Sequence, residues 1–218
     1  MARMIAIAEP PYICQREVGN LVTVTSASRR ALRLTLVRHG ESDWNVSRLV
    51  QGQDDRAQLT EEGRAQSRLL IESFRAREFD HVVSSDLSRA LETASIIGDA
   101  LTLATVSDPL LRERCFGAFE GGPLTNLTSD VTGITNAVVL DPDARPTGGE
   151  SFRDVVRRAE LFIERVTDEW PTRQLLVVTH GGTIRALRAY CSRAALEGLT
   201  WDPVANCSVW TVRASGVR

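Results

Sequence analysis

The stretch 36-LVRHGESDWN-45 places an arginine, a histidine and a glycine directly after a short apolar run that begins at Leu32. A run of this length and composition is typical of a buried strand, so Arg38 and His39 are expected where the strand ends. Each of these side chains disfavours the positive charge of the other unless an anion lies beside both. The stretch therefore indicates either a solvated strand end or one side of an anion site.

Two further apolar runs end in residues of the same kind. The run 81-HVVS-84 is followed by Arg89, one turn into a helical stretch, and the run 175-LLVVT-179 is followed by His180 and two glycines. Ligands of open α/β sheets bind in the crevice beyond the carboxyl ends of the strands. If the three strands are neighbours, two histidines and two arginines meet in one crevice.

Strand and helix patterns alternate along the chain from Leu32 onward. Strands are expected at 32–37, 81–84, 175–179 and 207–212, and helical patterns begin at Thr60, Leu87, Ser151 and Ile184. This alternation predicts an α/β protein whose mostly parallel central sheet is covered by helices on both faces, a three-layer α/β/α sandwich. Ser151 and Asp154 have the spacing of a capping box. Residues 117–150 are irregular and are expected to form an insertion over one end of the sheet.

Residues 1–30 are expected to lie outside this domain, which spans residues 31–218. They lack helical periodicity, contain Pro10 and Pro11, and end in a polar cluster. We interpret them as an extension that is either disordered or present because the start of the chain was assigned too early. The alternating residues 20–25 leave a strand as the alternative.

The composition excludes several classes of protein. The 26 basic and 28 acidic residues nearly balance, which leaves no overall charge for nucleic acid or an anionic membrane. All basic residues are arginine, which excludes Schiff-base, pyridoxal-phosphate and Walker-type lysines. The four cysteines form no C-x-x-C pair, no apolar run reaches the roughly 18 residues of a membrane span, and the first residues make a poor signal peptide. We expect a cytoplasmic protein, and no interface pattern specifies its oligomeric state.

The histidines and arginines suit phosphoryl transfer. A neutral imidazole can attack a phosphoryl group and carry it covalently, and positioned cations stabilise the charge on its equatorial oxygens. The leaving alkoxide needs an acid, for which 110-LLRERCFGAFEGG-122 offers Glu113 and Glu120 without a pattern that chooses between them. A metal site made from His39 and His180 is the alternative. It is disfavoured because the chain has no H-E-x-x-H motif and the neighbouring arginines would repel a cation.

Five motifs, in this order along the chain, resemble those of one family. They are R-H-G-E-S-x-W-N (Arg38 to Asn45), Q-G-x-x-D-x-x-L-T-x-x-G (Gln51 to Gly63, with one additional residue before Leu59), S-S-D-L-x-R-A-x-x-T-A (Ser84 to Ala94), E-R-x-F-G-A-F-E-G (Glu113 to Gly121) and T-H-G-G-x-I-R-A-L (Thr179 to Leu187). The family is the histidine phosphatase superfamily, in the branch of cofactor-dependent phosphoglycerate mutases and their phosphatase relatives. The resemblance runs from about Leu34 to Val212 and implies a phosphoglycerate mutase-like fold.

The resemblance implies a catalytic set in which His39 is the phosphorylated nucleophile and Glu113 the acid, with Glu120 in a structural loop position. The other members of this set form the phosphate pocket: Arg38, Arg89 and His180. The resemblance also implies a substrate-binding set. In this set Asn45 is a further phosphate donor, and the substrate path is lined by Gln51, Gly52 and the backbone of Gly181. Trp44 is expected to pack beneath the phosphate loop.

The implied function is hydrolysis of a small phosphorylated metabolite through a phosphohistidine on His39. It needs no metal or other cofactor and no nucleic-acid or membrane partner. Two alternatives remain, a cofactor-dependent phosphoglycerate-type mutase and an inactive binding module of the same fold. Arg114 occupies the place where the mutases use an arginine near the substrate, but their insertion is longer and more basic than residues 117–150, where Arg145 is the one arginine. The intact catalytic set argues against the binding module.

Overall fold

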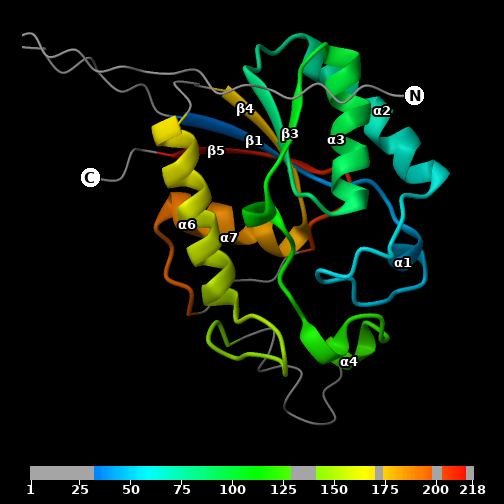
Figure 1. Ribbon diagram of the computed structural model, residues 1–218, viewed down its shortest axis with the longest axis vertical. Coiled ribbons are helices and arrows are strands. Elements are labelled where there is room, and N and C mark those ends of the chain that lie inside the picture. The colour runs from blue at the N-terminus through cyan, green and yellow to red at the C-terminus, as the bar shows by residue number, and fades with distance from the viewer. Residues whose placement is uncertain (1–31, 129–140, 170–173, 198–202, 215–218) are drawn as a thin grey trace, which may run out of the picture.

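The computed structural model describes residues 32–128, 141–169, 174–197 and 203–214 (Figure 1). The expectations for residues 1–30, including the alternative strand at 20–25, fall outside these ranges and stay predictions. Among the described helices, none is both long enough and apolar enough to cross a membrane.

The centre of the structure is a five-stranded sheet with the order β3-β2-β4-β1-β5. Its strands are β1 (Leu32–Arg38), β2 (His81–Ser84), β3 (Thr105–Ser107), β4 (Gln174–Thr179) and β5 (Val209–Ala214). All neighbouring strands are parallel except β5, which runs antiparallel to β1. The predicted, mostly parallel sheet is therefore confirmed. Since β2, β4 and β1 are consecutive neighbours, their three carboxyl ends lie at one edge.

Helices cover both faces of the sheet, as Figure 1 shows, with α6 and α7 on one side and α2 and α3 on the other. The helices are α1 (Asp43–Val46), α2 (Glu61–Arg75), α3 (Ser88–Leu101), α4 (Thr125–Thr128), α6 (Phe152–Glu169) and α7 (Gly181–Ser192), together with the short 3-10 turns η1 (Pro109–Leu111) and η2 (Gly117–Phe119). This arrangement confirms the three-layer α/β/α sandwich.

The side chains of β4 alternate between two hydrophobic clusters, one on each face of the sheet. Leu175 and Val177 pack with residues of α6 and α7, whereas Leu176 and Val178 pack with residues of α2 and α3. All four are fully buried. This is why the strand is a continuous apolar run, because a parallel strand covered on both faces has no solvent side.

Helix starts follow the caps expected from the sequence. The N–H of Gly63 donates to Thr60 Oγ1 at 3.0 Å at the start of α2. At the start of α6, the N–H of Ser151 donates to Asp154 Oδ2 at 2.7 Å and the N–H of Asp154 donates to Ser151 Oγ at 3.2 Å. Each such cap satisfies backbone donors that the helix itself cannot.

Two strands differ from the prediction. The last strand begins at Val209 and not at Cys207, because Cys207 has a left-handed backbone (φ 54°) and its N–H donates to the carbonyl of Arg38 in a turn. The strand Thr105–Ser107 was not predicted. It is a three-residue edge strand, partly exposed along its length, and too short to show an alternating pattern.

Truncating Phe162 is expected to destabilise the protein strongly. This side chain on α6 is fully buried, so Phe162→Ala should lower the free energy of unfolding by about 3–5 kcal/mol through lost burial and the cavity left behind. Leu161 is its neighbour but is 45% exposed, and Leu161→Ala should change stability by about 0.5 kcal/mol or less. Urea unfolding of both variants checks this, and equal losses would contradict the described packing of α6.

Candidate active site

The two histidines at the strand ends lie side by side. Arg38 on β1 is paired with Thr179 on β4, and the N–H of His39 donates to the carbonyl of Thr179 at 2.9 Å. The next residue, His180, begins α7 as its N-cap. The imidazole rings of His39 and His180 therefore come within 5.1 Å between centroids.

His39 is held in one tautomer. Its Nδ1 lies 2.7 Å from the carbonyl oxygen of Gly40, which can only accept a hydrogen bond, so Nδ1 carries the proton and Nε2 the lone pair. Burial, followed by the positive charges of Arg38 and Arg89, lowers the pKa of this imidazole well below its ordinary value of 6.5. The ring is thus neutral at pH 7, with a lone pair available for attack.

His180 is fully buried and has one ring nitrogen uncommitted. Its Nε2 lies 2.9 Å from Ser85 Oγ, while its Nδ1 is buried and makes no hydrogen bond within the described ranges. Burial, and then the charge of Arg89, lowers the pKa of this second imidazole well below 6.5. The free nitrogen can serve as a contact for a bound ligand.

Two guanidinium groups, of the buried Arg89 and the half-buried Arg38, flank these rings without an ion pair to any described carboxylate. Arg89 is 0% exposed and donates to the carbonyls of Asp54 (3.0 Å) and Gly52 (2.8 Å), and burial lowers its pKa to about 10. Arg38 donates to the carbonyl of Val204 at 2.5 Å. Neither forms an ion pair with any described residue, and the Nε of each is buried without a hydrogen bond. Because a buried charge is costly unless paired, this arrangement favours an anionic ligand.

The two candidate acids, between which only the family resemblance chose, have different environments. The Glu113 carboxyl accepts from the N–H of Arg114 at 2.8 Å and from the N–H of Gly182 at 3.0 Å, at the start of α7. Glu120 Oε1 accepts from the N–H of Gln53 at 3.0 Å and that of Phe116 at 2.8 Å. Glu113 therefore faces the histidines, and Glu120 holds loops together.

A cavity of about 180 Å³ lies at these strand ends. Its lining contains the whole predicted catalytic set and most of the predicted substrate-binding set: Arg38, His39, Arg89, Glu113, His180, Asn45, Gln51 and Gly52. Gly181 is not among the lining residues, because it begins α7 behind His180. Trp44 also lines the cavity.

Asn45 is fixed with its amide NH₂ free. Its Oδ1 accepts from the N–H of Ser42 at 3.1 Å and from Asn206 Nδ2 at 3.1 Å. With the oxygen occupied, the amide nitrogen is the group that can donate to a ligand in the cavity. Gln51 Oε1, on the same cavity wall, is buried without a hydrogen bond in the described structure.

Two residues that support the site were missed by the sequence reasoning. Asn206 Nδ2 lies 3.0 Å from the carbonyl of His39 and 3.1 Å from that of Gly40, and so fixes the backbone that orients the imidazole. Arg158 on α6 donates to the carbonyls of Leu110 and Arg112 and so fixes the segment that leads to Glu113. No motif marks either residue, because these carbonyl partners lie between 46 and 167 positions away in the sequence.

Arg114 does not reach the cavity. It is 2% exposed, and its guanidinium donates to the carbonyls of Glu150 and Ala144, both at 2.8 Å. Its side chain therefore joins the two ends of the insertion.

Within the described ranges, no group of three or more His, Cys, Asp or Glu side chains is arranged to hold a metal ion.

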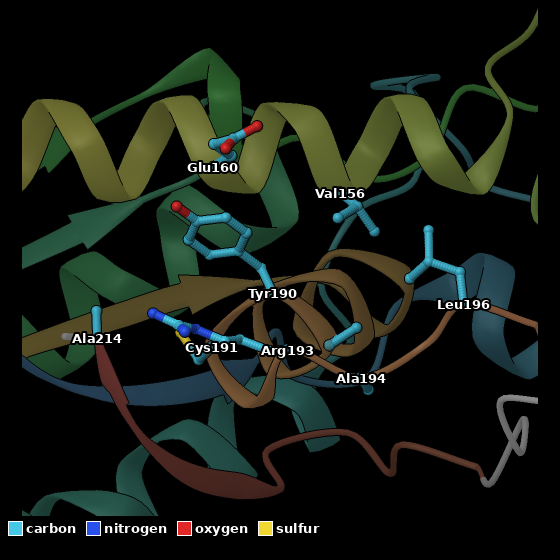
Figure 2. A pocket seen from close by; sticks show the side chains of 9 residues that line it. Val156, Glu160, Tyr190, Cys191, Arg193, Ala194, Leu196 and Ala214 are labelled. Carbon is cyan, nitrogen blue, oxygen red and sulfur yellow. The ribbon is translucent and has the colours of Figure 1, made fainter. Parts of the chain in front are cut away.

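A larger cavity of about 390 Å³ lies between α6 and the end of α7, as Figure 2 shows. Val156, Glu160, Tyr190 and Leu196 are among the residues that line it. It has no histidine in its lining and is remote from the carboxyl ends of the parallel strands, where ligands of α/β sheets bind. The strand-end cavity is the better candidate for chemistry.

The fold and the paired histidines now define the class of protein. A family model of the histidine phosphatase superfamily (branch 1) matches residues 34–217, and the chain belongs to this superfamily. The probable phosphoglycerate mutase GpmB of Yersinia pestis (strain Pestoides F) is 37% identical over 157 residues, which are 72% of this chain and 73% of that protein.

Two solved structures extend the likeness. A mycobacterial glucosyl-3-phosphoglycerate phosphatase in complex with VO3 is 35% identical with a TM-score of 0.74, over 83% of this chain and 92% of that one. YhfR of Bacillus stearothermophilus is 32% identical with a TM-score of 0.76, over 85% of this chain and 93% of that one. The family expected from the five motifs is confirmed.

The depressed histidine pKa values predict a loss of stability in acid. Below pH 6.5 the histidines of the unfolded chain bind protons, whereas the buried rings of His39 and His180 stay neutral in the folded protein. The free energy of unfolding therefore falls as the pH drops toward the folded-state pKa values. Above pH 6.5 these groups contribute no pH dependence. His39→Asn should make the fall shallower by up to about 1.4 kcal/mol per pH unit.

Urea unfolding between pH 5 and 7.5, in buffers without phosphate, measures this slope for the wild type, His39→Asn and His180→Asn. A difference between variant and wild type that stays constant with pH would contradict the burial of a neutral ring.

Proposed function

We propose that this protein is a phosphomonoesterase that hydrolyses a small phosphorylated metabolite through a phosphohistidine at Nε2 of His39. The observation that carries the proposal is the charge of the cavity, in which the buried guanidinium group of Arg89 and the half-buried Arg38, neither in an ion pair with a described residue, lie beside two imidazoles held neutral. A phosphate dianion supplies the missing negative charge, and arginine binds its oxygens through paired hydrogen bonds.

The first step forms the phosphohistidine. The Nε2 lone pair of His39 attacks phosphorus while the bond from phosphorus to the ester oxygen breaks. Arg38 and Arg89 stabilise the charge on the equatorial oxygens. Glu113, in its protonated form, gives its proton to the leaving alkoxide.

The second step regenerates the enzyme. Water attacks the phosphorus of the phosphohistidine, its proton passes to the Glu113 carboxylate, and the bond to Nε2 breaks. Inorganic phosphate and neutral His39 result. The same carboxyl group acts as acid in the first step and base in the second. Its two backbone hydrogen bonds fix the position of the carboxyl group in the cavity.

The position of Arg114 favours a phosphatase over a phosphoglycerate mutase. A mutase must retain and rebind an intermediate that carries two phosphate groups. The side chain of Arg114 instead donates hydrogen bonds to carbonyls of the insertion and is 2% exposed. One relative is named a phosphatase and another a probable mutase. The likeness to these proteins supports an enzyme that acts on phosphate esters.

Removing the nucleophile should abolish hydrolysis. With p-nitrophenyl phosphate, His39→Ala is expected to lower kcat by about 10³-fold or more, since no phosphoenzyme can form. The matched control is His81→Ala, because His81 lies at the opposite end of β2 from Ser84. Rapid acid-free quenching of the wild type should trap an acid-labile phosphoryl group on His39. Equal rates for His39→Ala and wild type would exclude the phosphohistidine route.

A test with 3-phosphoglycerate separates phosphatase from mutase. In the presence of 2,3-bisphosphoglycerate as primer, we expect slow release of inorganic phosphate and no accumulation of 2-phosphoglycerate, because Arg114 is held away from the cavity. Products are followed by phosphorus NMR. Rapid isomerisation without phosphate release would establish the mutase instead.

A further inference from the structure

The outer wall of the strand-end cavity differs in character from its inner end. The inner end holds the histidines, arginines and Glu113. The rest of the lining contains Asn45, Arg48, Gln51 and Gly52 together with six apolar side chains, defined here as the apolar wall: Trp44, Leu49, Val50, Phe116, Leu124 and Leu127. Among the described residues of that outer part, Arg48 is the charged one, and its side chain is exposed.

The apolar wall is a built structure. Residues 48–50 and 121–124 pair in antiparallel fashion, with the N–H of Leu124 donating to the carbonyl of Arg48 at 2.7 Å and the N–H of Val50 donating to that of Gly122 at 2.9 Å. Two members of the wall, Val50 and Leu127, are 2% and 4% exposed and pack with Phe116 and Phe119. The wall therefore has its own small core, which fixes its shape.

Part of the wall faces solvent. Leu124 is 37% exposed, and Trp44, Leu49 and Phe116 are partly exposed. Apolar surface gains free energy when another apolar group covers it. A hydroxyl or carboxylate group placed against the apolar atoms of these side chains would lose hydrogen bonds to water without gaining partners from them.

We infer that the substrate is a phosphate monoester of a small apolar alcohol, alkyl or aryl, whose apolar part lies against the apolar wall. The inference rests on the proposed phosphatase function and names the substrate class of the same site. The cavity volume of about 180 Å³ agrees with a small ester, because pockets for drug-sized ligands occupy roughly 300–1,000 Å³. Arg114, held by the insertion, is not positioned to bind a glycerate carboxylate.

The test uses esters with similar leaving-group chemistry. For n-alkyl phosphates from ethyl to hexyl, kcat/KM is expected to rise by about fourfold per methylene until the wall is covered. Propyl phosphate should exceed glycerol 3-phosphate, a polar ester of the same length, by at least about tenfold. Quenched phosphohistidine on His39 is measured with every ester.

Variants locate the effect on the wall. Leu124→Asn should reduce both the chain-length dependence and the preference for propyl over glycerol phosphate several-fold, and Leu49→Asn is the second variant if the first does not fold. Leu69→Asn is the matched control, because Leu69 on α2 is 78% exposed and lies outside the cavity lining. Arg48→Gln should leave the chain-length dependence as it is in the wild type.

The outcomes distinguish this inference from the function on which it rests. If glycerol 3-phosphate or glucose 6-phosphate forms the phosphohistidine and is hydrolysed as well as propyl phosphate, the substrate class is overturned while the phosphatase stands. A chain-length dependence that Leu124→Asn and Leu49→Asn leave unchanged also overturns it. If no ester, apolar or polar, labels His39, the proposed function itself fails.

Discussion

The pairing of β1 with β4 is the constraint on which the site depends. Arg38 lies opposite Thr179, and the backbone hydrogen bond from His39 to Thr179 continues the ladder one residue beyond the strand. A shift of one residue would send the side chains of either strand to the other face of the sheet. The clusters on the two faces make that shift costly, because the β4 side chains on both faces are fully buried. The same packing that stabilises the sheet thus fixes the distance between His39 and His180.

The electrostatics of the site follow from that packing. Arg38 and Arg89 donate hydrogen bonds to backbone carbonyls, which fix the two side chains but do not neutralise their charges. Their fields, added to burial, lower the pKa of both histidines. One arrangement therefore favours an anion and keeps the imidazoles neutral. Each consequence follows from placing cations in a poorly solvated space.

The remaining features of the site are supplied by loops that are held from a distance. Arg158 on α6 donates to the carbonyls of Leu110 and Arg112, before Glu113, and the N–H of Gly182 in the first turn of α7 donates to the Glu113 carboxyl. Arg114 joins the ends of the insertion, and residues 48–50 pair with 121–124 to make the apolar wall. The two histidines thus follow strands of the sheet, whereas the outer part of the cavity is built by loops, where binding residues are commonly found.

The sequence by itself determined the α/β/α architecture, the three strand ends and the residues gathered there, because strand and helix periodicity and the family motifs are local. It also determined the caps at Thr60 and Ser151, which depend on residues three positions apart. The family motif already indicated Glu113 rather than Glu120 as the acid. The tertiary structure alone decided the contacts of the two carboxyl groups, held Arg114 away from the cavity, placed Trp44 in the cavity wall and brought Asn206 and Arg158 beside the site. These outcomes depend on hydrogen bonds and packing between residues up to 167 positions apart, as between Asn206 and His39, and no local pattern encodes such contacts.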